Sequence, residues 1–111
     1  MEKLFQHGQT LIRINDDFFC NEIKRLINQI WKLIPMRENG EDWKQQIDTI
    51  FLEISGLQEG FRKYLSFLEI LSKLEGLYMV ETNFFKFRSE VFSIINLLEG
   101  AKEQWIDIVQ E

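Results

Sequence analysis

The stretch FFKFRSEVFSIINLLEGAKEQWIDI, from Phe84 to Ile108, carries the longest regular pattern in this sequence. Its apolar residues recur alternately three and four positions apart, at Phe84, Phe87, Val91, Ile94, Leu98, Ala101, Trp105 and Ile108. This spacing puts them on one side of an α-helix, so we predict a long C-terminal helix from about residue 82 to residue 110. Further apolar residues at Ile95, Leu97 and Val109 widen the stripe and favour a bundle core over a free coiled coil.

The length of this helix constrains the shape of the domain. At 1.5 Å per residue the helix would be about 43 Å long, whereas a compact domain of this size has a radius of gyration of about 13 Å and a diameter of about 34 Å. Either the bundle is elongated, or the helix breaks near Gly100, or its end projects towards a partner. Because glycine disfavours a helix interior, we expect Gly100 to mark close packing against another helix rather than a hinge.

Two further helices are predicted from helical spacing of apolar residues. The first follows the capping side chains of residues 15–17 and ends at Pro35. A charged loop at residues 36–42 contains Asn39-Gly40 and reverses the chain, with Asn39 as the expected cap of the second helix. That second helix begins at Trp43, and Ser55-Gly56 marks a stop or a kink. The stripes of the two helices comprise Phe19, Ile23, Leu26, Ile27, Ile30, Leu33 and Ile34, and then Trp43, Ile47, Ile50, Phe51, Ile54 and Leu57.

The segment from Phe61 to Tyr78 carries apolar residues on two sides of a predicted helix. One stripe contains Phe61, Tyr64, Leu65, Leu68 and Leu71, and the second contains Phe67, Ile70, Leu74, Leu77 and Tyr78. Such a helix either lies centrally in a bundle or presents one side to another chain. Four helices of this size can rarely cover two full faces of one member, so we predict that the second stripe forms the interface of a homodimer.

The sequence therefore predicts an all-α fold. We expect one domain over residues 1–111, built as an antiparallel bundle of four main helices plus a short N-terminal segment, with a long C-terminal helix. Residues 1–14 fit neither the helical nor the strand period, and Gly8 would interrupt a helix, so an arm or a short frayed helix is expected there.

Composition and charge exclude several classes of function. The net charge is −5, and both halves are acidic, with seven basic and nine acidic residues in 1–55 and six and nine in 56–111. Without clustered lysine and arginine we expect no nucleic-acid binding. No run approaches the ~20 apolar residues of a membrane span, so no membrane insertion and a cytoplasmic location are expected. One alanine against fourteen isoleucines suggests an AT-rich genome, and hence a bacterial or phage source.

The sequence contains no recognisable catalytic, cofactor or metal motif. His7 is the only histidine, and no Glu-x-x-His spacing, Gly-x-Ser-x-Gly turn or glycine-rich phosphate loop is present. The single cysteine, Cys20, lies beside an apolar stripe and is expected to be a buried structural thiol. The aromatic residues fall mostly on the predicted inward stripes, so we expect them to fill the core. We therefore predict no catalytic residues, no cofactor, no metal and no enzymatic activity.

The prediction for function is a non-enzymatic protein–protein interaction module, because surplus apolar surface in a small protein usually marks a contact with another protein. An acidic inhibitor, immunity protein or chaperone-like protein with a cationic partner is one specific form. In size, charge and helicity the chain broadly resembles immunity proteins of toxin systems and the helical chaperones of export systems, although no motif carries this resemblance. The alternatives are a small-molecule sensor with an aromatic pocket between helices and, in third place, a carboxylate-based hydrolase.

Overall fold

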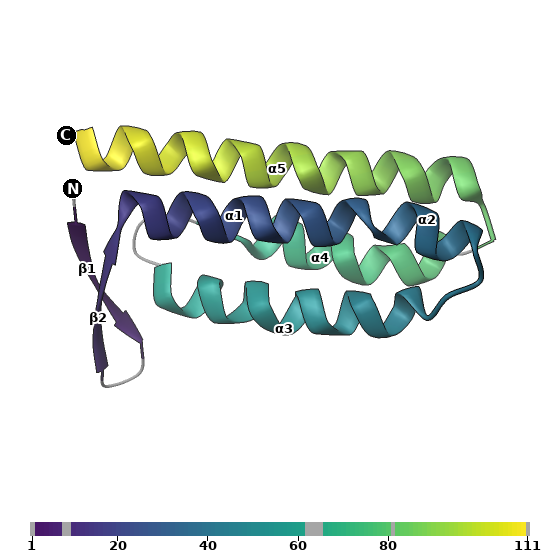
Figure 1. Cartoon of the computed structure of the whole chain (residues 1–111), viewed down its shortest axis with the longest axis horizontal. Helices are drawn as coiled ribbons and strands as arrows, with labels where there is room; N and C mark the ends of the chain where they lie inside the picture. Colours follow the sequence, from purple (N-terminus) through teal and green to yellow (C-terminus); the bar gives the residue numbers. More distant parts are fainter. Residues whose placement is uncertain (1, 8–9, 62–65, 81, 111) are drawn as a thin grey trace.

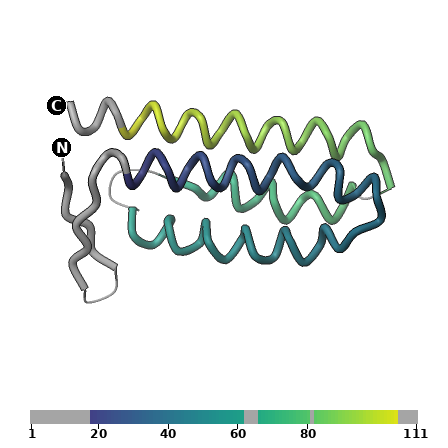
Figure 2. Tube along the Cα trace, in the orientation of Figure 1, coloured from purple at the N-terminus to yellow at the C-terminus, as the bar shows by residue number. Residues whose placement is uncertain are grey.

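In a computed structural model of this chain, the main helices run side by side in alternating directions and form an elongated bundle (Figure 1). The all-α prediction is therefore confirmed. The helices are α1 (Asp16–Trp31), α2 (Leu33–Glu38), α3 (Trp43–Phe61), α4 (Leu68–Gly76), the 3₁₀-helix η1 (Leu77–Val80) and α5 (Phe84–Gln110). The structure describes the backbone of residues 2–7, 10–61, 66–80 and 82–110, and the side chains of 18–61, 66–80 and 82–105. Figure 2 follows the path of the chain through the bundle.

The stripe of α5 lies in the core as predicted. Its buried members are Phe87, Val91, Ile94, Leu98, Ala101 and Trp105. Phe84 is half-buried, and the side chain of Ile108 lies outside the described residues. The helix runs for 27 residues without a break, and the molecule measures 43 × 26 × 19 Å. Of the three geometric alternatives, elongation of the bundle is the one that the structure shows.

Gly100 does not mark a close approach between helices. A methyl group built at Gly100 would have no neighbouring atom within 4 Å, so the expectation of close packing at this residue is wrong. The helix passes through Gly100 because the buried residues on both sides of it, Leu98 and Ala101, hold α5 against the core.

Three aromatic rings join α1, α3 and α5 at one end of the bundle. The ring of Trp105 stacks on the ring of Phe19 with 4.8 Å between centroids. Trp105 also meets Phe61 edge to face at 5.6 Å, and Phe19 and Phe61 lie 5.1 Å apart. All three side chains are buried. Aromatic pairs at these separations stabilise a core beyond the burial of their area, so this cluster ties the two ends of the sequence to its middle.

The first helix does not end at Pro35. Regular helix stops at Trp31, and α2 starts at Leu33, which puts Pro35 in the first turn of α2. Proline is tolerated there because the first N–H groups of a helix have no partner within it. The N–H of Asn39 donates to the carbonyl oxygen of Pro35 at 2.9 Å, so the helix continues past the proline.

The boundaries of the middle helices also differ from the prediction. Helix α3 passes through Ser55-Gly56 and reaches Phe61, so neither a stop nor a kink is needed there. The helix predicted from Phe61 onwards begins only at Leu68. Gly40 has a φ of 72° at the predicted chain reversal, a conformation that glycine adopts without strain. The cap of α3 is Asp42 rather than Asn39, since the Asp42 carboxylate accepts from the N–H of Gln45 at 3.1 Å.

The N-terminal segment forms a β-hairpin, so the short-helix alternative for residues 1–14 is wrong. Strands β1 (Glu2–His7) and β2 (Thr10–Asn15) pair antiparallel, with Glu2 opposite Asn15 and His7 opposite Thr10. Each strand supplies the backbone partners that the other needs, which an isolated arm would lack. In the sequence, a dipeptide that begins with glycine separates the strands, and this hairpin signal was not recognised.

The ring cluster predicts a large effect of Trp105→Ala on stability. Removal of this buried ring leaves a cavity between α1, α3 and α5, and we expect the free energy of unfolding to fall by about 3–5 kcal/mol. Chemical denaturation followed by circular dichroism measures the change. The control is Leu52→Ala on the surface of α3, where Leu52 is 73% exposed and an effect within about 0.5 kcal/mol is expected. Equal, small effects of the two substitutions would show that Trp105 is not in the core.

Candidate functional site

The stripe predicted as a dimer interface is part of the core of the single chain. Phe67, Ile70, Leu74 and Leu77 are buried in the structure, and Tyr78 is half-buried against the same core. The reason is the position of α4 and η1, which contact both α3 and α5. Because α3 and α5 cover this side of α4, the predicted contact surface is not available to a second chain.

The outer stripe of the same segment is only partly covered. Leu68 is 62% exposed and Leu71 is half-buried; Tyr64 and Leu65 lie outside the described residues. The ion pair between Lys73 and Glu90, 3.5 Å long, links α4 to α5 beside the buried stripe. The second stripe is therefore part of the core and not an interface, whereas the first stripe is divided, because Phe61 is buried and Leu68 is exposed.

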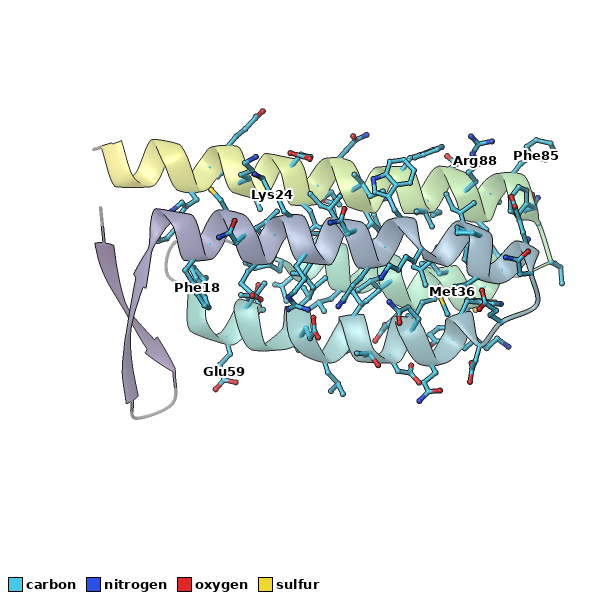
Figure 3. The ribbon with its side chains drawn as sticks, in the orientation of Figure 1. Phe18, Lys24, Met36, Glu59, Phe85 and Arg88 are labelled. Atoms are coloured by element: carbon cyan, nitrogen blue, oxygen red, sulfur yellow. The ribbon has the colours of Figure 1, made fainter. Side chains whose placement is uncertain are left out.

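A different surface collects exposed rings from α1 and α5. Trp31, at the end of α1, meets the ring of Phe92 edge to face, with 5.1 Å between centroids. The Arg88 guanidinium lies over the same Phe92 ring at 5.2 Å from its centroid. Phe85 lies seven residues before Phe92, on the same side of α5, and is 85% exposed. Figure 3 shows Phe85 and Arg88 projecting from the outer edge of α5. We call these four residues the Trp31 patch.

The Trp31 patch combines residue types that are common in protein interfaces. Tryptophan, arginine and phenylalanine are enriched in protein interfaces, where large rings bury much area at a small entropic cost. Trp31 is 43% exposed although its ring is large and apolar. A single exposed ring would need no explanation, whereas rings from two helices that meet beside a cation form a contiguous surface that a partner can cover.

Sequence reasoning missed this patch because it assigned the rings to the core. The positions of these rings relative to the apolar stripes of α1 and α5 indicated that they lie on the surface. Phe85 and Phe92 fall beside the α5 stripe and are seven residues apart, and Trp31 falls beside the stripe of α1. Apolar residues outside an otherwise complete stripe are left for the surface.

Three exposed basic residues, of which Arg88 belongs to the Trp31 patch, differ from the paired Arg25 of this acidic protein. Lys24, Lys32 and Arg88 are exposed, and within the described part of the chain none of the three joins an ion pair. Arg25, by contrast, is bound by Glu22 at 2.8 Å and by Glu53 on α3 at 2.9 Å. Within the described residues, the Arg88 guanidinium of the patch is thus not neutralised by an acidic side chain.

A second surface feature is a cleft of about 220 Å³ between α3 and the segment of α4 and η1. Its lining consists of Ile47, Asp48, Phe51, Glu75 and Tyr78. The Tyr78 hydroxyl donates to the Asp48 carboxylate and lies 3.2 Å from the backbone carbonyl oxygen of Lys44. Burial and this hydrogen bond raise the pKa of Tyr78 to about 12. At neutral pH the phenol is therefore a hydrogen-bond donor and not a base.

The described residues offer little for other chemistry. Among them, no three histidine, cysteine, aspartate or glutamate side chains come together as metal ligands, and no helix is long and apolar enough to cross a membrane. Cys20 is half-buried rather than fully buried as expected. His7 lies in β1, and its side chain is outside the described residues.

Comparisons with protein-family models, curated proteins and solved structures gave no match to this chain.

The pKa of Tyr78 predicts a pH dependence of stability. The folded chain holds the phenolic proton more tightly than the unfolded chain, whose tyrosine has a pKa of 10.0. The unfolding free energy therefore contains a contribution that is complete below pH 10 and is lost as the pH rises towards 12. The difference between wild type and Tyr78→Phe in urea unfolding should shrink over this interval. In an absorbance titration of tyrosinate, Tyr78→Phe should remove a transition near pH 12; an undiminished transition near pH 12 in the variant would contradict the assignment.

Proposed function

We propose that this protein is a non-enzymatic module that binds another protein through the Trp31 patch. The observation that carries this proposal is the meeting of Trp31, Arg88 and Phe92 across two helices, with Phe85 fully presented beside them. Other exposed apolar side chains, such as Leu52 on α3 and Leu68 on α4, lie on different helices from these rings. Solvation of these rings is unfavourable, and a partner that covers them gains the free energy of their burial.

The partner surface that fits this patch combines an apolar side chain with nearby carboxylates. The apolar group would cover Trp31 and Phe85, and a carboxylate would reach Arg88, which can bind it with two parallel hydrogen bonds. The acidic remainder of the chain contributes to specificity, because it repels acidic proteins that lack a matching apolar contact.

A partner of a different sequence suits the patch better than a second copy of this chain. In a two-fold dimer the patch would meet itself, which brings the Arg88 cations of both copies into one interface. Like charges at an interface are unfavourable. The homodimer predicted from the sequence stays a prediction, and a dimer would have to use a surface other than the buried stripe of α4.

The introduction of a negative charge at Phe85 tests the proposal. Phe85→Asp removes the most exposed ring, and we expect it to weaken capture of the partner by at least about tenfold, as for the loss of an interface hot spot. The measurement uses a photo-activated cross-linker on the tagged protein in cells of the source organism, followed by quantification of the captured protein. The matched control is Leu52→Asp, which places the same charge on an equally exposed apolar position of α3.

The comparison of Phe85→Asp with Leu52→Asp distinguishes loss of the patch from a general effect of the added charge. A protein that is captured by wild type and Leu52→Asp but not by Phe85→Asp supports the patch. Equal capture by all three, or a loss that follows Leu52→Asp alone, contradicts it. Circular dichroism of Phe85→Asp should show unchanged helicity, because the side chain contributes almost no buried area.

A further inference from the structure

The cleft at Tyr78 brings together two carboxylates from different helices. Asp48 belongs to α3 and Glu75 to the end of α4, and both line the same cleft. Asp48 already accepts the Tyr78 hydroxyl. A carboxylate has room for several hydrogen bonds, so Asp48 keeps acceptor capacity towards the cleft. Neither Asp48 nor Glu75 is in an ion pair within the described residues.

The rest of the cleft is apolar and aromatic. Ile47 is buried at its base, and Phe51 is half-buried beside it. The Tyr78 ring is fixed from two sides, by the hydrogen bond to Asp48 and by the ring of Trp43 at 6.2 Å between centroids. An aromatic ring and two carboxylates around an apolar base form the environment that a short organic cation prefers, because its charge and its carbon atoms are both accommodated.

The side chain of Lys44 does not line the cleft. The Lys44 ammonium lies 5.6 Å from the centroid of the Trp43 ring, and Lys44 is not among the lining residues of the cleft. A volume of about 220 Å³ is below the range of pockets for drug-sized ligands, about 300–1,000 Å³. It suits an alkyl chain of a few carbons with one charged end.

We propose that the cleft formed by Asp48, Glu75 and Tyr78 binds a short alkylammonium or alkylguanidinium group. The group can be a free amine or the end of a lysine or arginine side chain from another protein. In both cases the charged end lies between Asp48 and Glu75, and the alkyl part covers Ile47 and Phe51. The site is built from α3, α4 and η1, so it is separate from the Trp31 patch and does not depend on the function proposed for it.

Titration with n-butylammonium tests the site. We expect saturable shifts in the NMR signals of the Asp48 and Tyr78 amides and of the Trp43 indole, with a dissociation constant in the millimolar range. The neutral isostere n-butanol should give no saturable shift at the same concentrations. Glu75→Gln should raise the dissociation constant about tenfold, because it removes one of the two charges that face the ligand.

The matched control is Glu69→Gln. Glu69 is an exposed glutamate on the same helix, but it lines a different groove. An unchanged dissociation constant in this variant, with a weakened one in Glu75→Gln, supports a site at the cleft. Equal weakening in both would show that only the general negative charge attracts the amine, and equal binding of n-butanol would show that only apolar contact matters. Either result overturns the proposal.

Two peptide ligands distinguish the possible sources of the cation. A blocked tripeptide with a central lysine is compared with n-butylammonium, and the same peptide with norleucine in place of lysine serves as the control. Tighter binding of the lysine peptide than of n-butylammonium indicates a side chain from another protein. Binding of n-butylammonium without binding of the peptide indicates a free amine. Failure of both ligands contradicts the site.

Discussion

The contact of Trp105 with Phe19 and Phe61 is the interaction on which the rest of this structure depends. These rings come from the last, first and middle parts of the sequence, and their mutual packing fixes α5 against α1 and α3 at one end of the bundle. Because α5 is 27 residues long, the other helices must extend along it to cover its stripe. The chain meets this requirement by continuing α1 into α2 across Lys32, and by placing α4 and η1 one after the other. The elongated shape is thus a consequence of the length of one helix.

The same requirement decides which surfaces remain available for binding. Helix α4 is short and contacts both α3 and α5, so the apolar side that contains Ile70 and Leu74 is buried in the core. On the other side of the bundle, the core between α1 and α5 is already closed by Ile27 and Ile95. Trp31, Phe85 and Phe92 lie outside that closed layer, and their rings have no role in filling the core. Their burial must come from another molecule if it comes at all, which is why they form the stronger candidate for protein binding.

The sequence predicted the helical elements well where one apolar stripe was present. The α5 stripe and the stripes of α1 and α3 led to the correct fold class, since helical periodicity directly reflects which side faces the core. Pro35 was misread because a proline in the first turn of a helix removes no hydrogen bond within that helix, and Gly56 was misread because glycine in a helix interior costs only about 1 kcal/mol relative to alanine. The two stripes of the Phe61–Tyr78 segment could not be assigned to core or surface from periodicity, because the assignment depends on where α3 and α5 lie. The cleft at Tyr78 could not be predicted from the sequence either, since Asp48 and Glu75 belong to different helices and line one cleft only in the folded chain.

The most direct test of this account is the unfolding of Ile70→Lys/Leu74→Lys, because it distinguishes a core stripe from an interface. Both side chains are buried within one chain, and an unpaired buried charge costs several kcal/mol at each position. Against a typical total stability of about 5–15 kcal/mol, the two charges should abolish cooperative folding, and circular dichroism should show loss of most of the helical signal. A variant that stays fully helical and halves its mass in light scattering would contradict the account, and would place this stripe between two chains.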